Sequence, residues 1–523
     1  MTQTKNQRST PARSTGVLLL GPAPRWLIVL AACAVLTVSL PLIYLGVRAS
    51  ELPLDEIAVI LARPRVFELT LNTISLCVSV SVTTVALGTL IATILTRIRI
   101  RAARTWLLLS ALPLAVPSYL ASFGWLVVSP GLNGFWPSWM LLSAVTVPYV
   151  ILPVAASLRG SSAQGEAVAR TLGKGPLEAF WLVTWPQVRP AAIAGGLLVF
   201  LYSLSDFGLV AMLRFETLTW GVQQAYSASF DRAQAAILAL LLVIIAVIVV
   251  GAERGARGSL SRSTATNSHR ERVGLSTSLF LRFIVALPVT LGLVFPLVGL
   301  LLRLFEATSL ETINVSRLVS STISTVGVSI AAAILASLIA LPLAALAARY
   351  RGRWVGALEG AGYLSNALPG IVVGLSLVFF SLSVLPSLYQ TVPILVFAYA
   401  VLFMPKALGT SRSSIESVSP SLVAVARTLG ASPLAAWWKI TVRLALPGLG
   451  VGALLVAVTT MKELPATLML SPIGFNTLAT ELWSRTASGE FATAAPFATV
   501  LVLVAAIPAM ILSGVRSVAK EEM

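Results

Sequence analysis

The amino-acid sequence predicts an all-α polytopic membrane protein with about twelve transmembrane helices, arranged as two parallel six-helix repeats. Three observations carry this prediction. Of the 523 residues, 57% are hydrophobic and only 11% are charged, which is too little charge for the surface of a soluble protein of this size. The apolar residues form blocks of about 20 residues or more, the length that crosses a bilayer. One polar heptad also occurs twice, 257 positions apart.

Twelve apolar blocks are long enough to span a membrane as helices. Several contain Pro or Gly, which transmembrane helices tolerate because neighbouring groups satisfy the backbone atoms that are freed. The blocks are residues 26–47, 69–95, 106–128, 136–158, 190–213, 233–251, 279–304, 318–348, 356–384, 390–410, 445–471 and 493–514.

The net charge of +17 is concentrated in segments that would share one side of the membrane. The tail at residues 1–25 is basic and has no acid, and further arginines cluster at residues 97–104 and 349–353. Basic residues gather on the cytoplasmic side of membrane proteins, so both termini are expected in the cytoplasm. The same distribution argues against a patch that binds nucleic acid. The run behind the basic tail is too long for an ordinary signal peptide and is predicted to be the first helix.

Few side chains suit metal, redox or nucleotide chemistry. Cys33 and Cys77 lie in separate apolar blocks and His269 lies in a polar linker, so neither a disulfide framework nor a metal site is predicted. Residues 173–175 read Gly-Lys-Gly, but they lack the upstream glycine and the following Ser or Thr of a phosphate-binding loop. The chain is therefore expected to bind no nucleotide and no cofactor of its own.

The duplicated heptad belongs to a longer internal repeat. At a shorter offset, residues 73–75 match residues 322–324. Because each half contains an even number of spans, the halves should be related by an axis along the membrane normal. At the offset of the heptad, the matching pairs are Pro148 and Pro405, Pro176 and Pro433, Trp181 and Trp438, Pro190 and Pro447, and the acids Asp206 and Glu463.

These observations divide the chain into five parts. The expected boundaries are a cytoplasmic tail at 1–25, a first six-helix domain at 26–251, a cytoplasmic linker at 252–278, a second six-helix domain at 279–514 and a cytoplasmic tail at 515–523.

Each copy of the heptad is predicted to form a short helix in a polar segment between two spans. Val168 and Leu172 share one helix face, and Val425 and Leu429 repeat this arrangement. The final glycine of each copy can adopt the left-handed conformation that ends a helix. Such a helix either lies on lipid or docks in a partner's groove, and the identity of the copies favours docking because lipid accepts many sequences. The copies are Ala167, Val168, Ala169, Arg170, Thr171, Leu172 and Gly173, and Ala424, Val425, Ala426, Arg427, Thr428, Leu429 and Gly430.

These segments resemble a loop in the membrane subunits of ABC importers, which reads Glu-Ala-Ala-x3-Gly and continues to Ile-x-Leu-Pro. Counted back from the final glycine, the position of the family's Glu is Ala in both copies, and Glu166 stands one residue early in the first. Residues 183–186 approximate the tail of the motif, whereas the second copy has Ile440 in place but Arg443 where Pro is expected. The resemblance implies the type I transmembrane fold of ABC importers, with a coupling helix in each loop.

The resemblance also implies the partners. A permease subunit of this kind is not an enzyme: two copies of a separate ABC ATPase, which use ATP and Mg, dock on the two heptads. One periplasmic or lipid-anchored substrate-binding protein delivers the ligand. The protein would be a multi-pass protein of the bacterial plasma (inner) membrane that contacts membrane lipid and no nucleic acid. The alternative class is a secondary active transporter of the major facilitator type, but residues 96–101 lack the Asp and Gly that mark that class.

Within the importer family, the chain is most similar to fused permeases for ferric iron, and thiamine permeases of the same layout are the alternative. The resemblance is carried by residues 204–208, 462–467 and 474–480. Acids inside a span are costly and indicate function, and Fe³⁺ prefers hard oxygen ligands. Asp206 and Glu463 are therefore candidates for the translocation path or its outer gate. Alternatively, Glu463 pairs with Lys462 or a loop donor, and Asp206 caps a helix break. No metal-binding residue is firmly assigned.

Overall fold

The computed structural model describes residues 23–160, 164–257, 275–309 and 313–521, and most of these residues are helical. The helices of the first half are α1 (Arg25–Ser50), α2 (Leu54–Leu61), α3 (Pro64–Arg97), α4 (Ala103–Leu109), η1 (Leu112–Ala115), α5 (Ser118–Val128), α6 (Phe135–Thr146), α7 (Pro148–Gly160), α8 (Gln164–Thr171), α9 (Pro176–Ala179), η2 (Phe180–Thr184), α10 (Trp185–Ser205), α11 (Gly208–Met212), α12 (Leu218–Ser227) and α13 (Arg232–Arg257).

The second half repeats the pattern of long helices joined by short ones. Its helices are α14 (Leu275–Val289), η3 (Thr290–Val294), α15 (Phe295–Ser309), α16 (Val315–Arg349), α17 (Arg353–Gly362), η4 (Leu364–Ala367), α18 (Gly370–Val384), η5 (Pro386–Leu388), α19 (Val392–Ser417), α20 (Pro420–Thr428), α21 (Pro433–Ala436), η6 (Trp437–Val442), α22 (Arg443–Met461), α23 (Pro465–Leu470), α24 (Leu478–Ala487) and α25 (Phe491–Glu521). Three of the short elements, η2, η3 and η6, are π-helical turns.

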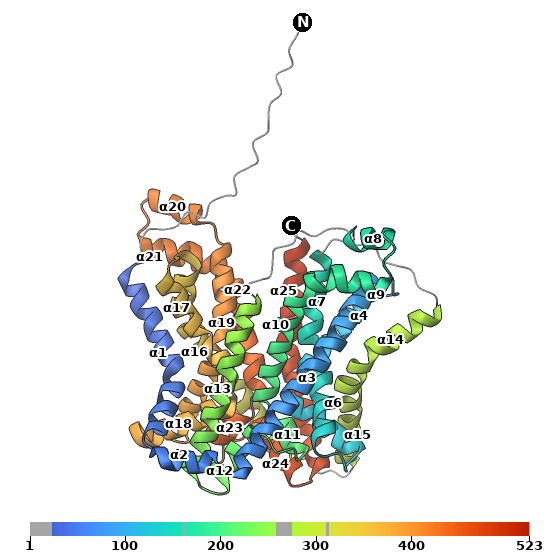
Figure 1. The fold of residues 1–523 in the computed structure, drawn as a ribbon. Helices are drawn as coiled ribbons and strands as arrows, with labels where there is room; N and C mark the ends of the chain where they lie inside the picture. Colours follow the sequence, from blue (N-terminus) through green and yellow to red (C-terminus); the bar gives the residue numbers. More distant parts are fainter. Residues whose placement is uncertain (1–22, 161–163, 258–274, 310–312, 522–523) are drawn as a thin grey trace.

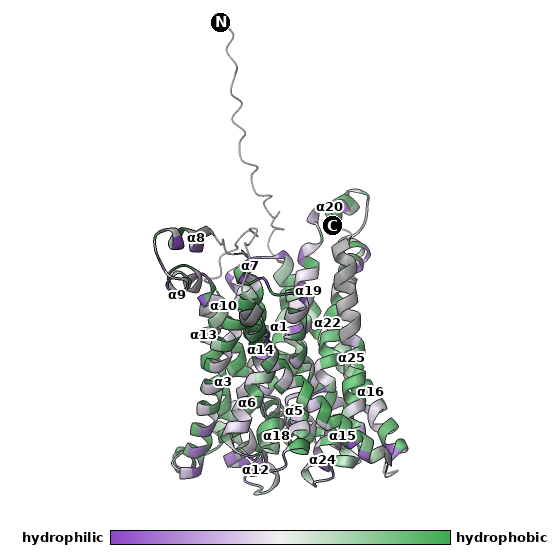
Figure 2. Cartoon of the chain, turned by 90° about the vertical axis from the view of Figure 1, so that its right-hand side faces the viewer, coloured by the Kyte–Doolittle hydropathy of each residue, from purple (hydrophilic) through white to green (hydrophobic). Residues whose placement is uncertain are grey.

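The long helices run between two faces of the molecule. The short helices α8 and α20 lie on one face, which we call the loop face, whereas α2, α12 and α24 lie on the far face (Figure 1). Hydrophobic residues cover the length of the long helices, and hydrophilic residues mark α8 (Figure 2). Because both copies of the heptad lie on one face, the two halves have the parallel orientation that the sequence predicts.

The predicted spans are present. Among the described residues, ten helical runs are long and apolar enough to cross a membrane, and twelve are if each of two bent pairs counts as one span. Every apolar block of the sequence corresponds to one of these runs or pairs. The bent pairs are Ala103–Ala115 with Ser118–Val128, and Arg353–Asn366 with Gly370–Val384.

The third and ninth blocks are not straight helices, as their hydropathy alone suggests, but are bent by 92° and 100°. The bends fall at Val116 and Leu368, which precede Pro117 and Pro369. The helical conformation is disfavoured for a residue that precedes proline. Val116 and Leu368 instead have extended ψ angles of 126° and 123°. We call these bends the elbows. They stand 252 residues apart and are a second repeated feature of the chain.

The fifth and eleventh spans also differ from the predicted blocks, 190–213 and 445–471. The helices begin earlier, at Leu177 and Pro433, and end earlier, at Ser205 and Met461. After each end the chain turns and resumes as a short helix, α11 or α23. The π turns η2 and η6 stand at equivalent positions near the loop-face end of these two spans. The two spans are therefore matched in shape as well as in sequence.

The first span of each half packs against the other half. Helix α1 contacts α16 and α18, and α15 contacts α5. Trp125 on α5 donates its indole N–H to the Leu291 carbonyl oxygen at 2.9 Å and stacks on Phe295, with ring centroids 4.7 Å apart. In a π turn, a carbonyl accepts from the amide five residues later. For Leu291 that residue is Pro296, which has no N–H, and the indole donates to the carbonyl instead. The halves are interlocked, an arrangement that the order of spans in the sequence does not reveal.

Two threonines establish the true register of the second span in each half. The hydroxyl oxygen of Thr73 accepts from the Leu218 amide at 2.8 Å, and that of Thr325 accepts from the Leu478 amide at 2.9 Å. Equivalent residues here are thus 252 apart. The expected match of residues 73–75 with 322–324 is wrong by three residues, because serines and threonines recur along the face of this helix.

The predicted N-terminal tail and most of the predicted linker lie outside the described residues, which omit 1–22, 258–274 and 522–523. Helix α13 continues to Arg257 and α14 begins at Leu275, so both ends of the predicted linker at 252–278 are helical. Helix α25 runs to Glu521, beyond the predicted end of the last span at residue 514.

Candidate functional site

Both copies of the heptad form a short helix on the loop face, as predicted (Figure 1). Gly173 and Gly430 have φ angles of 84° and 89°, so each adopts the left-handed conformation that ends its helix. The next amide closes each turn in the same way: Lys174 donates to the Ala169 carbonyl at 3.1 Å, and Ala431 donates to that of Ala426 at 3.0 Å. The identical sequences therefore give identical helix ends.

The apolar face of each heptad is exposed. The side chains of Val168 and Leu172 are 57% and 75% exposed, and those of Val425 and Leu429 are 56% and 82% exposed. The hydroxyls of Thr171 and Thr428 donate to carbonyls within their own helices. Large apolar side chains that stand out from a polar face mark a contact site for another molecule. This geometry supports the predicted docking role, which stays a prediction.

The two loops are held differently. The carboxylate of Glu166 in α8 accepts a hydrogen bond from the Thr184 hydroxyl at the start of the long helix. The equivalent residues in the second half are Val423 and Thr441, which cannot form this bond. In the sequence, Glu166 stands out only because it lies one residue before the position of the Glu in the family's loop motif. Its contact with Thr184 is not visible in the sequence, because 18 residues and a reversal of direction separate them.

Asp206 and Glu463 occupy the breaks that follow the fifth and eleventh spans. The Leu209 amide donates to Oδ1 of Asp206 at 3.0 Å, and the Ala466 amide donates to Oε1 of Glu463 at 3.1 Å. Each carboxylate therefore caps the short helix that follows it. The sequence offered helix capping as an alternative role for Asp206. The structure shows this role for Asp206 and also for Glu463.

Each of these acids also lies against the elbow of its own half. The first residue of α5 is Ser118, and its neighbour Tyr119 packs against Gly208, two residues after Asp206. The equivalent first residue of α18 is Gly370, where any Cβ would overlap the Glu463 carboxylate. The longer side chain of glutamate is thus accommodated by the loss of a side chain at the elbow. The breaks in the third and fifth spans of each half meet at these acids.

Lys462 links the two halves at this level. Its Nζ donates to the carbonyl oxygen of Ala115, at the elbow of the first half, at 2.5 Å. The Tyr119 hydroxyl donates to the Lys462 carbonyl oxygen at 3.4 Å. Among the described residues, the expected alternative of an ion pair between Lys462 and Glu463 is not found. A second lysine, Lys406 on α19, donates to the Thr459 hydroxyl at 3.0 Å. Sequence reasoning missed Lys406 because it searched the spans for acids.

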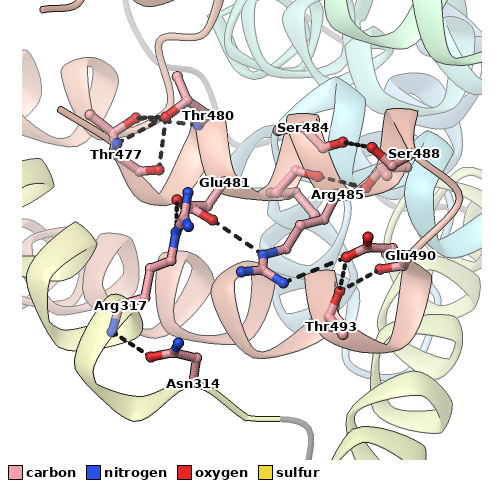
Figure 3. Close-up of polar contacts among 12 residues, drawn as sticks. Asn314, Arg317, Thr477, Thr480, Glu481, Ser484, Arg485, Ser488, Glu490 and Thr493 are labelled. Carbon is pink, nitrogen blue, oxygen red and sulfur yellow. Dashed lines mark hydrogen bonds and ion pairs between the residues drawn. The ribbon is translucent and has the colours of Figure 1, made fainter. Parts of the chain in front are cut away.

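An ion-pair cluster fastens the far face of the second half (Figure 3). Glu481 on α24 is 3% exposed and binds Arg317 at 2.6 Å and Arg485 at 3.2 Å. Arg485 also lies 3.7 Å from Glu490. The first half has a comparable contact, in which Arg65, 252 residues before Arg317, pairs with Glu216 just before α12. In both halves an arginine at the far-face end of the second span is thus tied to the segment that carries α12 or α24.

No resident metal centre is evident in the part of the chain that the structure describes. Within it, no group of three or more His, Cys, Asp or Glu side chains is arranged to hold a metal ion. The described geometry thus consists of two exposed helices on the loop face, two long helices that lead inward from them, and a polar centre between the halves.

Comparison with known sequences matches two stretches of the chain, residues 84–254 and 340–516, to the family described as binding-protein-dependent transport system inner membrane component. Together the stretches cover more than half of the chain, and each contains one copy of the heptad. The comparison therefore recovers the internal repeat independently.

One similar protein matches the chain over almost its full length. The chain is 32% identical over 504 residues to the Fe(3+)-transport system permease protein FbpB 2 of Haemophilus influenzae, which covers 94% of this chain and 98% of that protein. It is 29% identical over 248 residues to the molybdenum transport system permease protein ModB of Mycobacterium tuberculosis, with 43% of this chain and 92% of that protein covered. It is 28% identical to the putrescine transport system permease protein PotI of Escherichia coli, over 24% of this chain and 49% of that protein.

Proposed function

The chain belongs to the family of binding-protein-dependent transport system inner membrane components, and we propose that it is the permease through which ferric iron crosses the membrane. It is the permease subunit of an ABC importer, a multi-pass protein of the inner membrane and a transport component rather than an enzyme. Its partners are an ATPase and a substrate-binding protein.

One observation carries the proposal of iron as cargo. The Fe(3+)-transport permease matches almost the whole chain, including both halves and the segment between them. The permeases named for molybdenum and putrescine match 43% and 24% of the chain. Thiamine remains the alternative cargo, because a fused two-repeat layout is also typical of thiamine permeases.

The duplicated heptad supports a stoichiometry of two ATPase copies and one binding protein. Two equal docking helices, α8 and α20, suit two equal partners on the loop face. We place this face, with both termini, in the cytoplasm, because the arginine clusters at residues 97–104 and 349–353 precede α4 and α17 at the loop-face ends of their spans. The binding protein then docks on the far face. ATP and Mg belong to the ATPase.

The mechanism that we propose is a shift between two populated states of the permease. Closure of the ATPase pair on ATP moves α8 and α20, and the long helices that follow them in the chain end at Ser205 and Met461, next to Asp206 and Lys462. Helix α10 alone has 21 residues and therefore carries a displacement about 30 Å inward. Binding of ATP and of the loaded binding protein favours one state, and hydrolysis favours the other.

Reconstitution tests the proposed cargo. The permease, its ATPase and its binding protein are assembled in proteoliposomes, and ATP hydrolysis and ⁵⁵Fe uptake are measured. Binding protein loaded with Fe³⁺ should stimulate hydrolysis and give ATP-dependent uptake, whereas thiamine should do neither. Stimulation by thiamine with no response to Fe³⁺ would replace iron by thiamine as the cargo.

The path role of Asp206 and Glu463 needs variants that keep the helix caps. Asparagine caps a helix about as well as aspartate, so Asp206→Asn removes the charge and leaves the cap. If the carboxylates meet the cargo, combining Asp206→Asn with Glu463→Gln should lower iron uptake with little change in thermal stability. Unchanged uptake in this double variant would leave the acids with a capping role only.

A further inference from the structure

The two halves carry different chemistry at equivalent positions near the centre. In the first half, Tyr149 and Tyr202 pack with ring centroids 5.8 Å apart. The residues 257 positions later are Lys406 and Thr459, which form a hydrogen bond of 3.0 Å. Ser205 is likewise replaced by Lys462. The second half therefore adds two ammonium groups for which the first half has no counterpart.

These two lysines lie in one region between the halves. The Lys462 ammonium reaches the Ala115 carbonyl at the elbow of the first half. Lys406 donates to the Thr459 hydroxyl at 3.0 Å, and the Lys462 amide donates to the Thr459 carbonyl oxygen at 3.2 Å, so both lysines contact the same residue. Helix α19, which carries Lys406, also packs against α23, the short helix that follows Glu463. The two positive charges thus act together on whatever passes between the halves.

Neither lysine is neutralised by an ion pair among the described residues. Lys406 binds the Thr459 hydroxyl and lies over the Phe403 ring, 4.8 Å from its centroid, and Lys462 binds a backbone carbonyl. An ammonium group inside a membrane is expensive to keep, and the carboxylate beside these lysines, that of Glu463, can offset only one of the two charges. The three donors and the charge of an ammonium group suit an anion with oxygen acceptors.

The opposite side of the centre offers oxygen atoms. Ser118 and Tyr119 begin α5 at the first elbow, and Tyr119 packs against Gly208, two residues after Asp206. Carboxylate, hydroxyl and phenol oxygens are the donors that a hard cation prefers. The second half has oxygen atoms of its own there, on Glu463, Tyr399 and Thr467, so the two ammonium groups are what distinguish it from the first half.

We propose that Lys406 and Lys462 recognise a small oxyanion that accompanies the ferric ion, so that the cargo crosses as an iron–oxyanion complex. The inference rests on the proposed function. A bare Fe³⁺ ion is repelled by each ammonium three times as strongly as a monovalent cation at the same distance. An oxyanion bound to iron lowers the charge of the cargo, which weakens this repulsion, and presents oxygen acceptors to the ammonium groups. Phosphate and carboxylates such as citrate have the required chemistry.

Double-label transport tests this proposal with the wild-type complex. Proteoliposomes that contain the ATPase receive binding protein loaded with ⁵⁵Fe³⁺ in the presence of ³²P-phosphate or, in a second arm, ¹⁴C-citrate. One of the labelled anions should enter with iron in a fixed ratio that requires ATP. Iron entry without either anion would overturn the inference and leave the proposed function intact. A complex that takes up no iron would overturn both.

Variants provide an independent readout. Lys406→Met and Lys462→Met together should lower anion-accompanied iron uptake at least tenfold when uptake is compared at equal amounts of folded protein. Lys439→Met is the control, because Lys439 is an exposed lysine on η6, near the loop face. If the double variant does not fold, the single changes Lys406→Gln and Lys462→Gln are measured instead. Uptake equal to that of wild type in folded variants would contradict the proposal.

Discussion

Replacing Leu172 and Leu429 together by aspartate should abolish ATP-driven transport and leave a folded permease in the membrane. Both side chains are largely exposed at the ends of the heptad helices, 75% and 82%, so their loss costs the permease itself little. Buried in an ATPase groove, an apolar anchor of this kind contributes about 2 kcal/mol or more. Its replacement by a charge should therefore weaken each contact roughly 30-fold. The measurements are co-purification of the ATPase and stimulation of its activity by loaded binding protein.

Two controls separate docking from folding. Leu172→Met with Leu429→Met keeps the apolar volume and should retain transport. Leu177 and Leu434 are exposed leucines at equivalent positions five residues later, 72% and 62% exposed. Aspartate at these two positions should impair ATPase binding much less. Wild-type coupling in the Leu172 and Leu429 double variant would show that the heptads are not the docking elements.

The heptad helices were predictable because their determinants are local. A short run of Ala, Val, Arg and Leu, followed by a glycine, forms the same closed turn in both halves without help from distant residues. The number of spans and the parallel arrangement of the halves were predictable for a similar reason. Hydropathy reflects the solvent that surrounds each span, and the repeat is read directly from the sequence, so neither depends on how the helices pack.

The elbows and the helix breaks were not predictable from hydropathy, because an apolar block reads the same whether it is straight or bent. The prolines at 117 and 369 were visible in the sequence. Their effect was underestimated because transmembrane helices often tolerate proline. Here the residue before each proline has an extended backbone, and an acid from the fifth or eleventh span lies against the bend.

The interlocking of the halves could not be predicted, because it depends on which helices pack against each other, and hydropathy carries no information about these contacts. Helix α15 belongs to the second half by sequence, yet it packs on α5 of the first half. The residues that permit this contact are glycines at 124 and 299, which single-sequence hydropathy treats as weak points rather than contact points. Small residues let helices approach closely in a membrane, where packing rather than hydrophobicity drives association.

Gly299→Val should be the most destabilising single change in the membrane domain. A Cβ at Gly299 would overlap the carbonyl oxygen of Gly124, and a Cβ at Gly124 would overlap the backbone of Pro296. Because the obstacle is backbone on both sides, no side chain can rotate away, and α5 and α15 must separate. Overpacking of this kind costs about 3 kcal/mol or more. The separation would also break the hydrogen bond from Trp125 to Leu291.

Thermal unfolding of the detergent-solubilised protein checks this expectation, and two glycines in helices provide matched controls. A Cβ at Gly46 in α1 or at Gly327 in α16 meets no atom within 4 Å. Valine at either control position should therefore change the unfolding temperature little, whereas valine at 299 should lower it strongly and reduce the yield of folded protein. Because α5 and α15 come from different halves, the loss should also weaken the association of separately expressed halves. If Gly299→Val were as stable as Gly327→Val, the close crossing of α5 and α15 would not be what holds the halves together.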